Sequence, residues 1–176
     1  MHSWVTSVFA YHDFRVKRLV HSLKYKHSHG AADIFAPALA DALIEFLGEE
    51  TMFLGSRPIL VVPVPLSKKR FAKRGYNQAE LLAQKMTARI PNGNIRVKTD
   101  LLKKIKETKP QVDIKKRSIR LSNLGDCFAI TPQSASGGEV IVLLDDVTTT
   151  GATLTAARKA LRAAGFHKIY GLAVAH

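Results

Sequence analysis

Residues 140–161 read VIVLLDDVTTTGATLTAARKAL, an apolar run followed by a polar turn and then a longer mixed segment. Its five leading apolar residues predict a buried strand over residues 140–144. Two aspartates, three threonines and a glycine follow, directly before a segment that predicts a helix over about 151–164. A last apolar segment at about 169–174 predicts another strand. Strand, helix and strand at these lengths form a βαβ unit, which belongs in a parallel sheet.

The polar residues of this stretch come where parallel sheets bind ligands. Asp145 and Asp146 follow the predicted strand, and ligands of open parallel sheets bind beyond the carboxyl ends of the strands. The backbone amides from Thr149 to Thr153 then open a helix N-terminus, whose unpaired N–H groups accept a phosphate. Gly151 lets the backbone approach a ligand closely. A sugar phosphate fits this pattern, with its hydroxyls on the carboxylates and its phosphate on the amides.

Other interpretations of the same residues remain open at this point. Aspartate and threonine are favoured at helix N-caps, so the motif could serve only to cap the helix. Nucleoside triphosphate and dinucleotide sites are less favoured, because the sequence has no GxxxxGK[ST] motif and no GxGxxG after a strand.

The composition fits one domain over residues 1–176, since 46% of the residues are hydrophobic. A net charge of +13 favours phosphate-rich partners such as nucleotides, phosphosugars or nucleic acid. Cys127 is the one cysteine, which excludes an intrachain disulfide and a cysteine-rich zinc module and favours a reducing compartment. The sequence shows no signal-peptide pattern and no apolar run of about 18 residues. We therefore expect a cytoplasmic protein without membrane insertion.

The remaining segments predict an α/β fold with an open, mainly parallel twisted sheet flanked by helices. An N-terminal flap over residues 1–55 would precede a ligand-binding core over residues 58–176. In chain order, we expect a strand at 4–11, two helices of which the second ends at Gly48, a buried strand at 59–64, a helix from about Gly75 to Ile90, and a short strand at 127–130.

Two basic stretches interrupt this pattern. The run KKRFAKR at 68–74 directly follows the buried strand, so Lys68, Lys69 and Arg70 either bind phosphate or form a solvated face. Residues 96–120 contain ten basic residues against three acidic ones, and Pro110 interrupts any helix. They predict a mobile basic loop, poorly ordered from about Lys106 to Lys116 without ligand.

Three segments carry a resemblance to a known family. DDVTTTGAT, between a strand and a helix, resembles the phosphoribosyl pyrophosphate (PRPP) signature of type I phosphoribosyltransferases. Within that group, VPVPLSKKRFAKRGYNQAE at 62–80 and TKPQVDIKKRSIRLSNLGDCFAI at 108–130 resemble the ComF family. The resemblance spans most of residues 58–176 and implies a type I phosphoribosyltransferase-like fold.

The resemblance also implies roles for individual residues. Asp145 and Asp146 would hold the ribose hydroxyls, and the turn after VPVP would bind pyrophosphate with Mg²⁺, which takes no direct ligand from the protein. Lys109 and Arg117, on the basic loop, would join the aspartates in catalysis by closing over the ligand. The expected PRPP-binding residues are Lys68, Lys69, Arg70, Asp145, Asp146, Thr148, Thr149, Thr150, Gly151, Ala152 and Thr153.

Metal and acceptor sites are less well defined. Many ComF-type proteins carry a four-cysteine zinc module, and we expect no zinc here. His27 and His29 lack a third ligand and indicate a surface turn, while Tyr11 is interpreted as a packing residue. Residues 1–55 stand in place of the usual base-recognition hood, so the resemblance implies no particular acceptor.

Two functions follow from these residues. The first is Mg²⁺-dependent transfer of a phosphoribosyl group to an unidentified acceptor. The second is a non-catalytic PRPP or nucleotide sensor, or an accessory protein that binds single-stranded DNA, because ComF-type proteins resemble components of natural transformation. Expected partners are PRPP or a related nucleotide ligand, single-stranded DNA and DNA-uptake proteins. The residues expected to contact nucleic acid are Lys73, Arg74, Lys103, Lys104 and Lys106.

Overall fold

A computed structural model describes residues 4–25, 28–54, 57–91, 94–106, 127–131 and 138–176. Within these ranges the chain forms a five-stranded sheet in the order β1-β7-β6-β2-β3, and every neighbouring pair is parallel. A separate antiparallel pair joins β4 and β5. The predicted α/β fold with a mainly parallel sheet is confirmed. The strands are β1 (Val5–Phe9), β2 (Ile59–Pro63), β3 (Ile95–Val97), β4 (Leu102–Lys104), β5 (Phe128–Ile130), β6 (Val140–Val147) and β7 (Ile169–Ala175).

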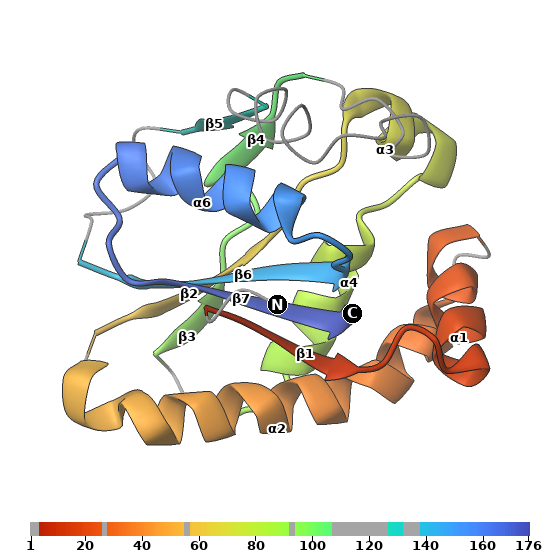
Figure 1. The fold of residues 1–176 in the computed structure, drawn as a ribbon, viewed down its shortest axis with the longest axis horizontal. Coiled ribbons are helices and arrows are strands. Elements are labelled where there is room, and N and C mark those ends of the chain that lie inside the picture. The colour runs from red at the N-terminus through yellow and green to blue at the C-terminus, as the bar shows by residue number, and fades with distance from the viewer. Residues whose placement is uncertain (1–3, 26–27, 55–56, 92–93, 107–126, 132–137) are drawn as a thin grey trace.

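Helices cover both faces of the sheet (Figure 1). Helices α2 and α4 pack with one face, where Phe35, Leu82 and Val142 belong to one buried cluster. Helix α6 and the β4–β5 pair pack on the other face, where Leu102, Ile141 and Leu154 belong to a second cluster. The helices are α1 (Phe14–Tyr25), α2 (His29–Leu54), α3 (Lys68–Arg74), α4 (Gln78–Thr87) and α6 (Ala152–Ala163).

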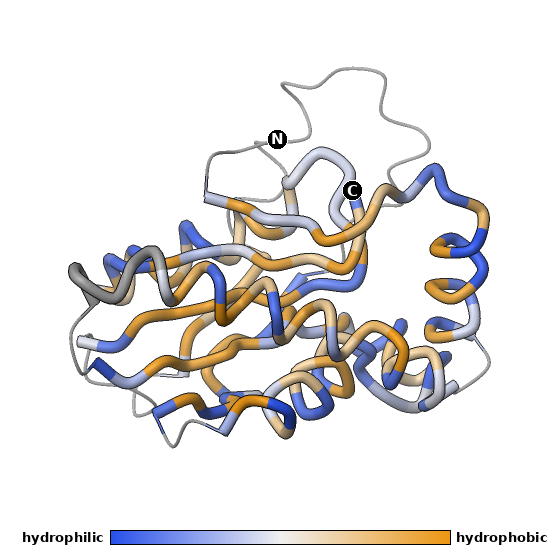
Figure 2. The backbone as a smooth tube through the Cα atoms, turned by 90° about the horizontal axis from the view of Figure 1, so that it is seen from below, coloured by the Kyte–Doolittle hydropathy of each residue, from blue (hydrophilic) through white to orange (hydrophobic). Residues whose placement is uncertain are grey.

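The central strands are buried because both of their faces are covered. All residues of β2 and the first five residues of β6 are buried. Such strands have continuous apolar runs rather than alternating ones, as the sequence predicts here. The strands are accordingly hydrophobic over most of their length, whereas α1 alternates between hydrophobic and hydrophilic positions (Figure 2).

Three predicted boundaries are wrong. Helix α2 does not end at Gly48 but continues to Leu54, since a glycine inside a helix costs only about 1 kcal/mol. The helix predicted from about Gly75 begins later, because Gly75 has a φ of 76° and ends a separate helix, α3. Helix α4 then begins after Asn77, whose Oδ1 accepts a hydrogen bond from the Ala79 amide at 3.1 Å.

The third error concerns the loop predicted over residues 96–120. Strands β3 and β4 fall in its first part, and Leu101 and Leu102 are fully buried, so apolar packing there overrides the high charge. Residues 107–126, and with them Lys109, Arg117 and most of the predicted mobile segment, lie outside the described residues. In the described ranges, no helix is long and apolar enough to cross a membrane.

Close packing at the edge of the sheet gives a test of the fold. A Cβ atom at Gly171 of β7 would lie 3.0 Å from Cγ2 of Val5 and 3.1 Å from Cζ3 of Trp4. Gly171→Ala should overpack this edge and lower the free energy of unfolding by about 1–3 kcal/mol in urea denaturation. Adding Val5→Ala makes room for the new methyl group. The free energy of unfolding of the double variant should therefore fall by less than the sum of the losses in the two single variants. Additive losses would show that the contact is not tight.

Candidate functional site

A cleft opens at the carboxyl ends of β2 and β6. From β2 the chain continues to β3 on one side, whereas from β6 it continues to β7 on the other, and such reversal points form crevices in parallel sheets. The Val64 amide donates to the Leu144 carbonyl at 2.9 Å, which joins the two strand ends. The cleft encloses about 530 Å³ and is lined by Tyr11, Lys24, Val64, Pro65, Leu66, Arg70, Arg74, Asn77, Gln78, Ala79, Lys104 and residues 145–153.

The two aspartates at this edge are held by the backbone beside them. Strand β6 extends beyond the predicted Leu144 to Val147, so both carboxylates belong to its last residues. Oδ1 of Asp145 accepts from the Asp146 amide at 2.8 Å, and Oδ1 of Asp146 accepts from the Val147 amide at 2.7 Å. These bonds stay within the strand, so the aspartates do not cap the helix that follows.

The electrostatic environment differs between the two carboxylates. Nζ of Lys24 lies 3.2 Å from Oδ1 of Asp146, and the two side chains are 20% and 12% exposed. Burial, and after it the negative charge of Asp146, raise the pKa of Asp145 to about 7. The positive charges of Lys24 and Lys104 act in the opposite direction.

The loop after β6 presents backbone amides to the cleft. Gly151 adopts a left-handed conformation with a φ of 70° and precedes α6, and no side chain caps this helix. The Thr148 amide donates to the Ala175 carbonyl, while the Thr148 carbonyl lies 2.9 Å from Nδ1 of His176. The hydroxyl of Thr150 is buried and has no partner among the described residues. This loop therefore offers an anion an uncapped helix N-terminus and a buried hydroxyl donor.

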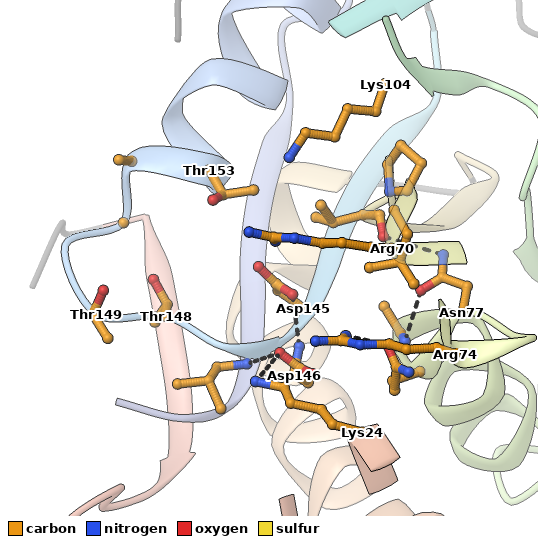
Figure 3. A pocket seen from close by; sticks show the side chains of 18 of the residues that line it. Lys24, Arg70, Arg74, Asn77, Lys104, Asp145, Asp146, Thr148, Thr149 and Thr153 are labelled. Atoms are coloured by element: carbon orange, nitrogen blue, oxygen red, sulfur yellow. Dashed lines mark hydrogen bonds and ion pairs between the residues drawn. The ribbon is translucent and has the colours of Figure 1, made fainter. Parts of the chain in front are cut away.

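Basic side chains line the opposite wall (Figure 3). Arg70 and Arg74 are four residues apart on α3, so both extend from one face of the helix toward the aspartates. Lys104 reaches into the cleft from β4. Nη1 of Arg74 donates to Oε1 of Gln78 at 2.8 Å, which fixes that guanidinium.

The structure brings some of the predicted site residues into the cleft and leaves others outside it. Arg70, Asp145, Asp146 and residues 148–153 line the cleft, whereas Lys68 and Lys69 are exposed and do not line it. Residues 68–74 form helix α3, so the basic side chains expected to bind pyrophosphate lie on a helix that follows the turn after VPVP. Arg74 and Lys104, assigned to nucleic acid by the sequence, line the cleft instead. Lys73, Lys103 and Lys106 are exposed outside it.

Comparisons with known proteins support one family. "Competence protein ComFC" of Bacillus subtilis is 32% identical over 155 residues, which are 88% of this chain and 56% of that protein. "Competence protein F" of Haemophilus influenzae is 37% identical over 124 residues, which are 66% of this chain and 50% of that protein. The chain belongs to the ComF family.

A third ComF relative, "DNA utilization protein YhgH" of Escherichia coli strain K12, is 28% identical over 136 residues, which are 77% of this chain and 56% of that protein. The chain spans about half the length of the curated relatives it matches. No family model matches the chain.

Asn77, Gln78, Tyr11 and Lys24 are among the residues of this ComF cleft that were not assigned to it from the sequence. Asn77 and Gln78 belong to the RGYNQ segment that carries the family resemblance, and Nδ2 of Asn77 donates to the Val64 carbonyl at 3.1 Å. Tyr11 packs against the core as predicted but also lines the cleft. Lys24 carried no signal, because nothing in the sequence joins α1 to the end of β6.

We expect any Mg²⁺ in the ComF cleft to be held together with phosphate oxygens of a ligand. Within the described ranges, no group of three or more His, Cys, Asp or Glu residues could hold a metal. Proteins usually hold Mg²⁺ through one or two carboxylates together with substrate phosphates. Here Oδ1 of each aspartate already accepts a backbone amide, and an ammonium group lies beside Asp146.

The raised pKa of Asp145 makes the stability of this ComF chain depend on pH. The folded pKa of about 7 exceeds the ordinary aspartate pKa of 3.8, so between these pH values the folded state holds a proton that the unfolded chain has lost. Asp145 thus makes the protein less stable as pH rises through this window. Asp145→Asn removes this pH dependence. Between about pH 5 and pH 8, the free energy of unfolding of the variant should therefore rise by about 1–3 kcal/mol relative to that of the wild type. Urea denaturation of both proteins measures this, and a difference that does not vary with pH would contradict the shift.

Proposed function

We propose that the chain binds PRPP, or a closely related phosphoribosyl ligand, in the cleft at the ends of β2 and β6. The observation that carries the proposal is the order of charges along the cleft. Two carboxylates lie between an amide-rich loop on one side and three cations on the other. PRPP has the complementary order, with two hydroxyls between a 5-phosphate and a pyrophosphate.

Each part of this ligand has a matching group. The hydroxyls would donate to Asp145 and Asp146, since a carboxylate offers about four lone-pair sites and the backbone amides use only part of them. The 5-phosphate would bind the amides and hydroxyls at residues 149–153, at the positive end of α6. The pyrophosphate would lie against Arg70, Arg74 and Lys104, whose bonds to phosphate oxygens are charge-assisted.

The same arrangement suits transfer of the phosphoribosyl group. The bond between the anomeric carbon and the pyrophosphate oxygen breaks, its electron pair leaves with the pyrophosphate, and a lone pair of the acceptor forms the new bond. Arg70, Arg74 and Lys104 would stabilise the charge that develops on the leaving group, and the carboxylates would face the positive charge that develops on the sugar. Mg²⁺ bound to the pyrophosphate would supply further charge neutralisation.

Removal of the two carboxylate charges tests the sugar site. Asp145→Asn together with Asp146→Asn keeps the side-chain size, so the protein should fold while PRPP affinity falls about tenfold or more, since hydrogen bonds to charged groups contribute about 1.5–3 kcal/mol each. The measurement is the rise in melting temperature on addition of PRPP and Mg²⁺, which depends on ligand concentration over Kd. An unchanged rise in the double variant would contradict the proposal.

Helix α3 offers a matched control for this measurement. Arg70→Ala should weaken PRPP binding about tenfold, whereas Lys69→Ala removes an equal charge from the adjacent exposed position and should have little effect. Equal losses in the two variants would mean that overall charge, rather than the cleft, attracts the ligand.

A second function has its own supporting observation. Lys68, Lys69, Lys73, Lys103 and Lys106 are exposed outside the cleft, on α3 and around β4. The names of the relatives concern competence and DNA utilisation. We propose that this chain also takes part in DNA uptake, in the cytoplasm and together with other uptake proteins, and that these lysines bind phosphates of single-stranded DNA.

Salt dependence tests the DNA-binding proposal. Affinity for a single-stranded oligonucleotide should fall steeply with salt, because each neutralised phosphate releases counterions. Replacing Lys68, Lys69 and Lys73 with alanine should reduce the slope of log K against log salt by about 2, at about 0.7 for each phosphate contact. Lys159→Ala, at an exposed position of α6, is the control and should leave the slope nearly unchanged. A flat affinity in the wild type would contradict DNA binding without bearing on the cleft.

A further inference from the structure

We propose that Lys24 is a built-in counter-cation of the aspartate pair, and that it takes the place beside Asp146 which a protein-bound divalent ion would otherwise occupy. The inference rests on the proposed phosphoribosyl site and adds a positioning residue from α1. Its consequence is that the ribose end of the ligand binds without Mg²⁺, and that the ion accompanies only the pyrophosphate.

The position of Lys24 is the first support. Its Nζ lies 3.2 Å from Oδ1 of Asp146, and both side chains are largely buried. Lys24 also lines the cleft, below the aspartates in Figure 3, so its ammonium belongs to the site itself rather than to the outer surface.

The chain on either side of Lys24 is anchored. Leu23 is fully buried, and its carbonyl accepts a hydrogen bond from the hydroxyl of Tyr76. The ring of Tyr25 lies 5.9 Å from Nζ of Lys73 and 5.4 Å from the guanidinium carbon of Arg74. The end of α1 is thus attached to the segment that supplies the basic wall. The backbone that carries Lys24 is therefore held beside the cleft, within reach of Asp146.

The charges of the site give the second support. Two adjacent carboxylates repel each other, and the charge of Asp146 contributes to the raised pKa of Asp145. Lys24 opposes this by favouring the ionised form of Asp145. A fixed ammonium thus supplies the positive charge that the pair needs to accept two ribose hydroxyls.

The same ammonium disfavours a metal at the aspartates. Mg²⁺ requires near-ideal octahedral geometry at about 2.0–2.1 Å from its oxygen ligands and gives up its water reluctantly. Oδ1 of Asp146 already has the Val147 amide at 2.7 Å and the ammonium at 3.2 Å as neighbours. A divalent ion at this oxygen would have to displace Lys24 or lie against a like charge.

Ribose 5-phosphate is the probe that isolates this effect, because it has the hydroxyls and the 5-phosphate but no pyrophosphate to chelate Mg²⁺. Calorimetric titration with wild-type protein should give the same Kd, within about twofold, in EDTA and in millimolar Mg²⁺. Lys24→Gln should bind about tenfold more weakly in EDTA, through loss of a charge-assisted contact, and Mg²⁺ should restore much of the affinity.

Binding of Mn²⁺ to the protein alone provides a second readout, measured by electron paramagnetic resonance. Lys24→Gln should bind Mn²⁺ more tightly than wild type, because the aspartates lose their ammonium neighbour. Lys24→Arg keeps the charge and should behave as wild type. Lys17→Gln removes an exposed charge from the same helix and should also leave both measurements unchanged.

The outcomes separate this inference from the proposed function. Wild-type binding of ribose 5-phosphate that requires Mg²⁺, or Lys24→Gln binding that equals wild type in EDTA, would overturn the role of Lys24 while leaving the phosphoribosyl site in place. Failure of folded wild-type protein to bind ribose 5-phosphate in either buffer would overturn the proposed function and this inference together.

Discussion

The pairing of β2 with β6 is the interaction on which the rest of the site depends. After these two strands the chain continues to opposite sides of the pair, to β3 from β2 and to β7 from β6, which leaves room for a ligand between the segments that follow. Because both strands are buried, the polar groups at their ends have fixed positions. The hydrogen bond from Val64 to Leu144 continues the pairing to the point where the two segments separate.

The RGYNQ segment, residues 74–78, connects several parts of the molecule. Arg74 belongs to the basic wall, Tyr76 binds the end of α1, and Asn77 both caps α4 and binds the loop after β2. The segment has no apolar periodicity of its own, yet each of these side chains makes a contact with another element. A short polar motif of this kind therefore has a structural role beyond any contact with ligand, since its loss would separate α1, α3 and the cleft loop.

The sequence predicts those parts of the fold that follow from local patterns. Continuous apolar runs identified β2 and the start of β6, and the Gly-Thr-rich turn identified the start of α6. The extension of β6 through the aspartates was not predicted, because backbone pairing with β7 continues to Val147 while the apolar run ends at Leu144. Lys69 and Arg70 carry the same charge, so the sequence KKRFAKR does not show which of them faces the cleft. The orientation of α3 about its own axis determines that Arg70 lines the cleft and Lys69 does not. Lys24 reaches Asp146 only through tertiary packing, so local patterns carry no trace of it.

The chain has one tryptophan, and its place in the fold determines what intrinsic fluorescence can report. Trp4 packs against Gly171, and the guanidinium carbon of Arg158 lies 4.3 Å from the centre of its ring. Trp4 precedes β1, whereas the cleft lies beyond the opposite, carboxyl ends of the parallel strands. Its emission should therefore follow the detachment of the β1 edge from the sheet and remain insensitive to occupation of the cleft. The protein thus contains an optical probe of its own stability that is separate from its ligand chemistry.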